Sequence, residues 1–240
     1  MGRDLCLRGK ITMPVPCLAG VILNLAANRF FVYYLGLPLF LDTVFTVSVT
    51  FIGGVFWGAL CGTLTNLTGK MIWFSGRDWT SSLFFLCNVA TALITWLFIR
   101  FFPRELDLSS EHAKYERKPR TAGIEGGSGK LASPMKLAMS MDRVIVLILL
   151  SFALCLAISI LGGLISALIL LINPSQTENR ILAGLLNDTL SGGAVPIILA
   201  EILSRIPVNI IDRLITAFAG YGVALLLKKM TVTFFSHSTL

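Results

Sequence analysis

The fold of this chain is decided by residues 37–66, which read LPLFLDTVFTVSVTFIGGVFWGALCGTLTN. The stretch is apolar enough to lie in a membrane, but it is too long for one crossing by a helix of about 20 residues. Two adjacent glycines, Gly53 and Gly54, lie near its middle, with Asp42 near one end and Asn66 at the other. Whether the stretch crosses the membrane once or twice therefore decides the topology of the whole protein.

The composition of the chain indicates an integral membrane protein. Of its 240 residues 55% are apolar and 14% are charged, and its mean hydropathy is +0.80, whereas soluble domains carry about 25% charged residues. The length allows a single membrane domain, residues 1–240. The net charge of +7 is typical of Lys and Arg gathered on the cytoplasmic side, so we expect the lipid bilayer and not nucleic acid as the partner of these charges.

Hydropathy along the chain predicts an all-α, polytopic protein with six transmembrane helices in one bundle. The predicted helices cover residues 13–34, 38–53, 55–74, 82–102, 144–172 and 206–227. A polar, basic loop, 103–142, separates the fourth helix from the fifth, and an outer segment, 173–205, separates the fifth from the sixth. A single crossing by residues 38–74 would give five helices instead.

The distribution of Lys and Arg favours six helices. Six crossings place fourteen basic residues on the face that holds the termini and loop 103–142, and six on the opposite face. Five crossings would separate the basic N-terminus from the basic loop. Because positive residues prefer the cytoplasm, we expect six crossings with both termini and the loop cytoplasmic. The second helix is then short, since 16 residues span about 24 Å of a core about 30 Å thick.

Several polar groups fall toward the outer side of this predicted bundle. Ionisable residues inside a membrane are costly and usually face the bundle interior or a water-filled cavity. We therefore predict an outward-facing substrate pocket near Trp73, Phe74 and Trp79. The candidate substrate-binding residues are Asp42, Asn66, Asn88, Asn209 and Asp212, and Glu201, Arg205 and Arg213 fall on the same side. The alternative is that these groups lie at the membrane interface or pair with one another.

Three glycines, Gly54, Gly58 and Gly62, recur every four residues and share one helix face. Small residues at this spacing let helices approach closely in lipid. They either pack inside the bundle or form a contact with another membrane subunit.

The sequence offers little support for catalysis. Both histidines, His112 and His237, lie outside the predicted helices, and none of the five cysteines forms a CxxC pair. A metal site therefore has too few ligands, and no glycine-rich phosphate loop followed by Lys and Ser or Thr is present. We expect no enzymatic activity, no metal and no cofactor.

Residues 36–44 (GLPLFLDTV), the pair Gly53-Gly54, residues 58–67 (GALCGTLTNL), Asn88 and residues 206–215 (IPVNIIDRLI) together resemble the substrate-binding (S) components of energy-coupling factor vitamin transporters. This sequence has Gly54 where that family usually has proline, and it lacks the family's Ala-x-x-x-Ala pattern in the first helix. The resemblance implies a six-helix subunit, in the cell membrane of a prokaryote, that captures a vitamin-like nutrient from outside. It also implies partners: a transmembrane coupling subunit and two ATPase subunits.

Two functions remain open at this point. The first is the substrate-capture subunit of such an importer, with acidic, amide and aromatic groups suited to a ligand with amine, hydroxyl or heterocyclic donors. The second is a membrane sensor or signalling module that uses the same kind of bundle without transport.

Overall fold

The computed structural model describes residues 13–36, 39, 41–73, 80–108, 140–172 and 194–237. Within these residues the chain is all-α and forms six α-helices: α1 (Pro14–Asn28), α2 (Val44–Gly53), α3 (Val55–Trp73), α4 (Phe85–Phe101), α6 (Met141–Ile172) and α8 (Ala194–His237). A π-helical segment, η1 (Arg29–Tyr34), continues α1, and a 3-10 helix, η2 (Thr80–Phe84), leads into α4. Most of the predicted loop 103–142 and of the predicted outer segment 173–205 lies outside the described residues, as do Phe74 and Trp79.

Four helical segments are long and apolar enough to cross a membrane. They are Pro14–Tyr34, Ser82–Phe101, Met141–Ile169 and Ile198–Met230. These segments indicate a multi-pass membrane protein, in agreement with the composition.

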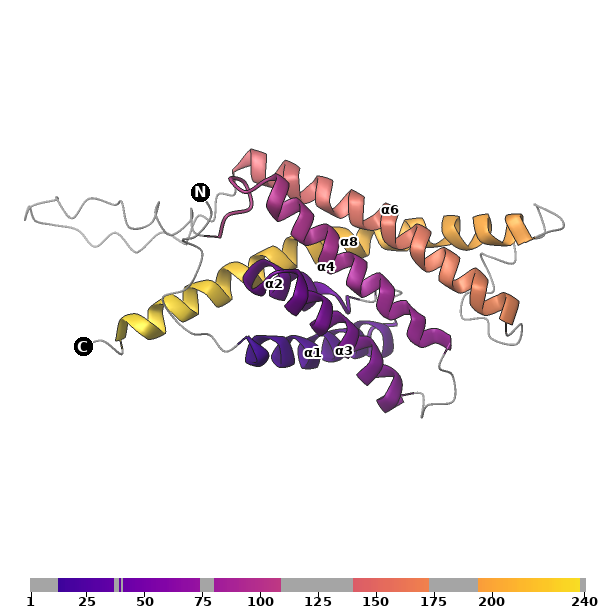
Figure 1. Ribbon diagram of the computed structural model, residues 1–240, viewed down its shortest axis with the longest axis horizontal. Helices are drawn as coiled ribbons and strands as arrows, with labels where there is room; N and C mark the ends of the chain where they lie inside the picture. The colour runs from indigo at the N-terminus through magenta and orange to yellow at the C-terminus, as the bar shows by residue number, and fades with distance from the viewer. Residues whose placement is uncertain are drawn as a thin grey trace, which may run out of the picture.

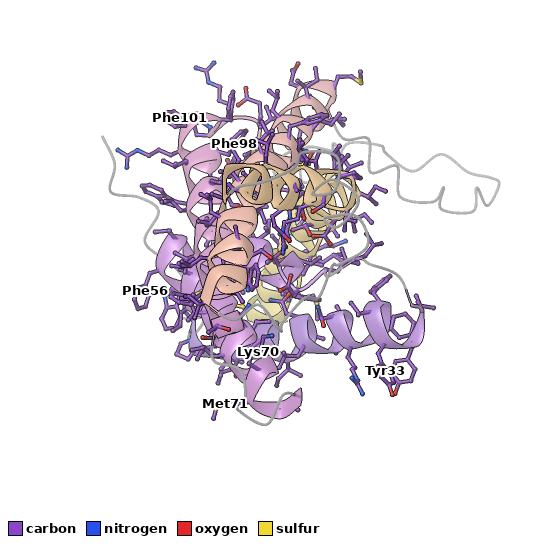
Figure 2. The ribbon with its side chains drawn as sticks, turned by 90° about the vertical axis from the view of Figure 1, so that its right-hand side faces the viewer. Tyr33, Phe56, Lys70, Met71, Phe98 and Phe101 are labelled. Carbon is purple, nitrogen blue, oxygen red and sulfur yellow. The ribbon has the colours of Figure 1, made fainter. Side chains whose placement is uncertain are left out.

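The bundle carries apolar side chains on the outside and polar ones within. The exposed large side chains of α6 follow one another at intervals of three or four residues: Ile145, Leu149, Phe152, Leu156, Ile160, Leu164, Leu168 and Ile172. Figure 2 shows Tyr33, Phe56 and Phe101 on the outside of other helices. Asn24 and Asp212, in contrast, are fully buried. Soluble monomers rarely expose apolar stripes of this extent, so we expect the stripe on α6 to face lipid.

Successive helices run in alternating directions (Figure 1). A Cβ placed on Gly53 would lie 3.1 Å from the sulfur of Met13, so the α2–α3 turn lies beside the start of α1. At the same end of the bundle, the Arg143 side chain at the start of α6 donates a hydrogen bond to the carbonyl of Glu105, just after α4 (2.8 Å). The C-terminal half of α8 also reaches this end.

The hairpin predicted at Gly53-Gly54 is confirmed. Helix α2 ends at Gly53 and α3 begins at Val55. Gly54 between them has φ +83°, a left-handed conformation that glycine adopts without the steric cost that a Cβ brings. The long apolar stretch is therefore two helices, not one.

Three predicted helix boundaries are clearly wrong. Helix α2 begins at Val44 and not at residue 38, so its ten residues extend about 15 Å. The last helix runs from Ala194 to His237 and not from residue 206 to 227. Glu201 and Arg205 are part of it, lie one turn apart and pair with each other (3.9 Å). Asp212 consequently lies near the middle of α8 and not near its outer end.

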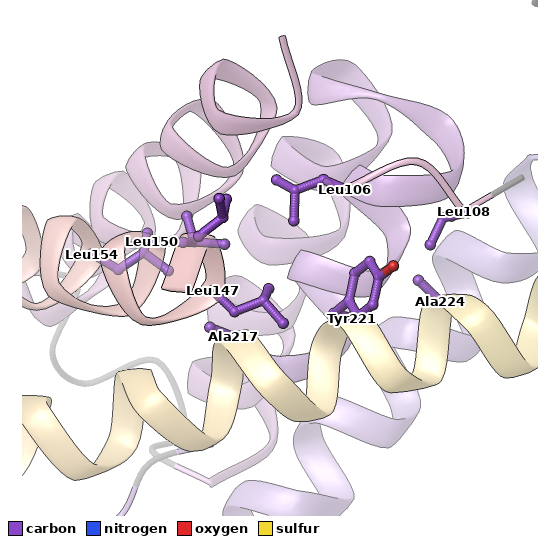
Figure 3. Close-up of a cluster of buried hydrophobic side chains, with 9 residues drawn as sticks. Leu106, Leu108, Leu147, Leu150, Leu154, Ala217, Tyr221 and Ala224 are labelled. Carbon is purple, nitrogen blue, oxygen red and sulfur yellow. The ribbon is translucent and has the colours of Figure 1, made fainter. Parts of the chain in front are cut away.

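Helices α6 and α8 form the most extensive contact of the bundle, and much of the apolar core lies along it. Figure 3 shows this core cluster: Leu147, Leu150 and Leu154 of α6 face Ala217, Tyr221 and Ala224 of α8, with Leu106 and Leu108 covering one end. The segment after α4 thus closes the bundle with buried leucines.

Farther along the same contact, Gly163 of α6 lies against the backbone of α8. A Cβ on Gly163 would lie 2.9 Å from both the Cα and the backbone nitrogen of Ile202. A backbone atom cannot turn aside as a side chain can, so the two helices would have to separate.

We therefore expect Gly163→Ala to lower the free energy of unfolding by about 1–3 kcal/mol, the usual cost of overpacking. Gly222→Ala, in α8, is the matched control because a Cβ there meets nothing within 4 Å, and alanine favours a helix over glycine by about 1 kcal/mol. Melting of the detergent-purified protein measures both. Equal melting temperatures for the two variants would show that α6 and α8 do not approach this closely.

Candidate functional site

Residues 41–43 bring a non-helical stretch of backbone into the middle of the bundle. The Leu41 N–H donates a hydrogen bond to Oδ1 of Asp212 (3.0 Å). The Arg213 guanidinium donates one to the hydroxyl of Thr43 (2.6 Å). Leu41 is buried and has φ +38°, a conformation that costs a non-glycine residue about 1–2 kcal/mol. The two side chains of α8 thus help to hold the strained segment from which α2 begins.

Asp212 and Arg213 also form an ion pair, with 2.9 Å between Oδ2 and Nη2, and both side chains are buried. Removing charges from water is costly, and close pairing offsets part of that cost. The pair therefore satisfies two needs at once: each charge compensates the other, and each side chain binds the backbone or hydroxyl of the segment before α2.

Asn24 of α1 caps the start of α2. The residue at the N-cap position, Thr43, makes no capping hydrogen bond with its side chain. Instead the Phe45 N–H donates to Oδ1 of Asn24 (3.0 Å). The Asn24 amide group in turn donates to the hydroxyls of Thr46 (3.1 Å) and Thr65 (3.3 Å). Asn24 is fully buried and lies at the centre of the candidate span Pro14–Tyr34.

Asn24 was not among the predicted site residues. The signal available in the sequence was a single amide within an apolar span, a placement that is usually functional or buried in the bundle. Its partners could not be predicted, because the pairing depends on α2 beginning at Val44.

Three of the predicted residues, Asp42, Asn88 and Asp212, meet at this point. Asp42 lies outside the four candidate spans and keeps part of its surface accessible. Its carboxyl group lies close enough to interact with the charges of Arg213 and Asp212, and the Asn88 side chain donates a hydrogen bond to it. The Asn88 side chain also donates to the carbonyl of Gly62 (2.9 Å), which ties α4 to α3 beside Asp42.

Among the described residues, no hydrogen bond or ion pair joins the other two predicted residues to Asp42. The Asn209 amide donates to the hydroxyl of Ser159 on α6 (2.9 Å), so it serves the α6–α8 contact. Asn66 is half-buried, and its Oδ1 has no hydrogen-bond partner among the residues that the structure describes. The contacts of the described residues thus join three of the five predicted residues, and a common pocket for all five stays a prediction.

The glycines at the four-residue spacing pack within the chain itself. A Cβ on Gly58 would overlap the hydroxyl of Thr50 on α2, and a Cβ on Gly62 would lie 2.8 Å from the Cβ of Asn88 on α4. Both glycines are buried. Gly58 and Gly62 therefore pack inside the bundle, which is the first of the two roles expected for these glycines. No free surface is left on them for a second subunit. Gly54 serves the turn.

Glu201 and Arg205 form a separate group on α8. Besides its pairing with Glu201, the Arg205 guanidinium lies 5.3 Å from the ring centre of Phe84 in η2. Over the described ranges, no group of three or more His, Cys, Asp or Glu side chains could hold a metal ion.

Comparisons with protein-family models, with curated proteins and with solved structures found no match to this chain.

The role of Asn24 as a cap is tested by Asn24→Leu, which keeps a side chain of similar size. The change leaves the N–H of Phe45 without its acceptor, and an unsatisfied buried group costs about 1–3 kcal/mol. We expect thermal melting in detergent to show that loss of stability. Leu23→Ala, at a neighbouring position that is 44% exposed, should have a much smaller effect. A fully stable Asn24→Leu variant would exclude the cap.

The ion pair is tested by a double-mutant cycle on Asp212 and Arg213. Asp212→Asn keeps an oxygen for the Leu41 N–H but removes the ion-pair partner of Arg213, and breaking a buried ion pair costs about 3–5 kcal/mol. Arg213→Met likewise leaves a lone carboxylate.

The double variant should be less destabilised than the sum of the two single changes by at least about 1 kcal/mol, measured by chemical unfolding in mixed micelles. Additive effects would show that the two charges do not interact.

Proposed function

We propose that this chain is the substrate-capture (S) subunit of an energy-coupling factor importer in the cell membrane of a prokaryote. In this proposal its six helices cross the membrane with both termini on the cytoplasmic side. The chain binds a vitamin-like nutrient from outside and has no enzymatic activity. A transmembrane coupling subunit and two ATPase subunits complete the importer.

The observation that carries the proposal is the convergence of Asp42, Asn88 and Asp212 on the start of a half-length helix. Transporters commonly place their substrate site near the middle of the membrane, where a helix is interrupted and its polar backbone groups are held by neighbouring helices. The Asp212–Arg213 pair holds the segment before α2, but that role does not require the second carboxylate, Asp42, and buried charges are weak contributors to stability.

The sequence resemblance supports the same function. Residues 36–67, which carry the strongest part of that resemblance, supply Asp42, α2, the Gly54 turn and the face of α3 that meets Asn88. The residues that resemble the S components are thus the ones that surround the polar cluster.

The proposal predicts that the detergent-purified protein retains a small organic molecule. Mass spectrometry after denaturation should detect that molecule in a fixed ratio to protein, and calorimetry should measure its rebinding. Cells that carry the protein should lose uptake of the labelled compound when the gene for this chain or the genes for the ATPase subunits are deleted.

Two outcomes would contradict transport. The first is purified protein that releases no organic molecule and binds none of a panel of vitamins and related nutrients. The second is uptake that continues without the ATPase subunits while a cellular response to the compound requires this chain, which would favour the sensor function.

A further inference from the structure

The charges of the central cluster, which consists of Asp42, Asn88, Asp212 and Arg213, do not cancel. Asp212 and Arg213 compensate each other through their ion pair at 2.9 Å. Asp42 adds a second carboxylate beside them, and the nearby Asn88 is a neutral amide. When Asp42 is ionised, the cluster therefore holds one negative charge in excess.

No other described cation reaches this position as a partner of Asp42. Arg205 pairs with Glu201 and lies against Phe84. It precedes Asp212 by seven residues, or about 10 Å along the helix. That second pair is neutral in sum, so it leaves the excess charge at Asp42 unchanged. An uncompensated charge in a poorly solvated interior is costly. Either a proton on Asp42 or a positively charged ligand relieves that cost.

Access distinguishes the two carboxylates. Asp212 is fully buried and occupied by Leu41 and Arg213. Asp42 as a residue is half-buried. A ligand that binds its carboxylate need not displace Leu41 or Arg213 from Asp212.

Polar atoms without a hydrogen-bond partner lie next to the Asp212–Arg213 ion pair. They point to a ligand independently of the excess negative charge. Nε of Arg213 and the hydroxyl of Thr216 are buried and have no hydrogen-bond partner among the described residues. Thr216 lies on α8 one turn after Asp212 and one turn before Gly220. A Cβ on Gly220 would lie 3.0 Å from the carbonyl oxygen of Val44, at the start of α2. The hydroxyl of Thr216 therefore lies on the face of α8 turned toward the start of α2. Buried polar groups nearly always have partners.

We propose that the site takes an organic cation: a small molecule with one positively charged nitrogen, bound by the carboxylate of Asp42, and with a neighbouring hydrogen-bond acceptor for Nε of Arg213 or the hydroxyl of Thr216. This inference names the substrate class of the proposed capture subunit and rests on that proposal. Arg213 stays paired with Asp212, so the ligand replaces no internal contact.

Pairs of probes that differ mainly in charge test the proposal on the full-length protein in detergent. Choline and its uncharged isostere 3,3-dimethylbutan-1-ol form one pair, and benzylamine and benzyl alcohol form the other. At millimolar concentration at least one of the cations should raise the melting temperature of the wild-type protein, and neither neutral isostere should. Asp42→Asn should weaken apparent affinity for that cation at least tenfold.

Glu201→Gln is the matched control, because it makes the same chemical change on α8 in the group that pairs with Arg205. It should leave the shift caused by the cation in place. Stabilisation by the neutral isosteres to the same extent, a shift that persists in Asp42→Asn, or the absence of any shift with both cations would each overturn the proposal.

The molecule released from the purified protein separates this inference from the proposed function. A neutral or anionic nutrient whose uptake requires the ATPase subunits would leave the importer function intact and refute the cationic ligand. Binding of the cations at Asp42 without any ATPase-dependent uptake would do the reverse.

Discussion

The structure depends on one constraint: a helix that begins inside an apolar bundle must find partners for its first N–H groups. At a helix start these groups have no acceptor within the helix, and lipid offers none. Helix α2 solves the problem with side chains from distant parts of the chain. Asn24 accepts from Phe45, and Asp212 accepts from Leu41 just before the helix. The polar residues of α1 and α8 are therefore required where α2 begins.

The placement of charge within α8 follows from the same constraint. A carboxylate is a strong acceptor for a backbone N–H, but alone in this interior it would be too costly. Arg213 compensates it and binds Thr43 in the same arrangement. A structural requirement at the start of α2 thus brings a charged pair into the bundle centre, and Asp42 adds a second carboxylate there.

Much of the fold could be predicted from the sequence because membrane helices leave a strong apolar signal. The hairpin at Gly54 and the alternating directions of the helices were predicted correctly. The start of α2 could not be, since residues 37–41 are as apolar as the helix itself. The start of α8 was missed for the opposite reason: Glu201 and Arg205 indicated a loop, yet as a pair one turn apart they are compatible with a buried helix.

The candidate site could be predicted only in part. Asp42, Asn88 and Asp212 were recognised as costly polar groups in apolar surroundings, and they do lie together. Asn66 and Asn209 carried the same signal, yet no hydrogen bond or ion pair within the described part of the chain joins them to Asp42, and Asn209 binds Ser159 instead. Polarity in a span indicates that a group needs a partner, but which partner it finds depends on helix register, and that is fixed by contacts between residues far apart in the chain.

The hydrogen bond between Leu41 and Asp212 joins residues that are 171 positions apart. A ribosome makes the first three helices well before the last one, so α1, α2 and α3 have been made while the acceptor for Leu41 does not yet exist. Asn24 is available from the start and can cap α2 within this early unit. The segment before α2 reaches its final form only when α8 inserts, so assembly of the polar centre is the last step in making the protein. A chain truncated before α8 would lack that centre even if its first helices were correctly placed.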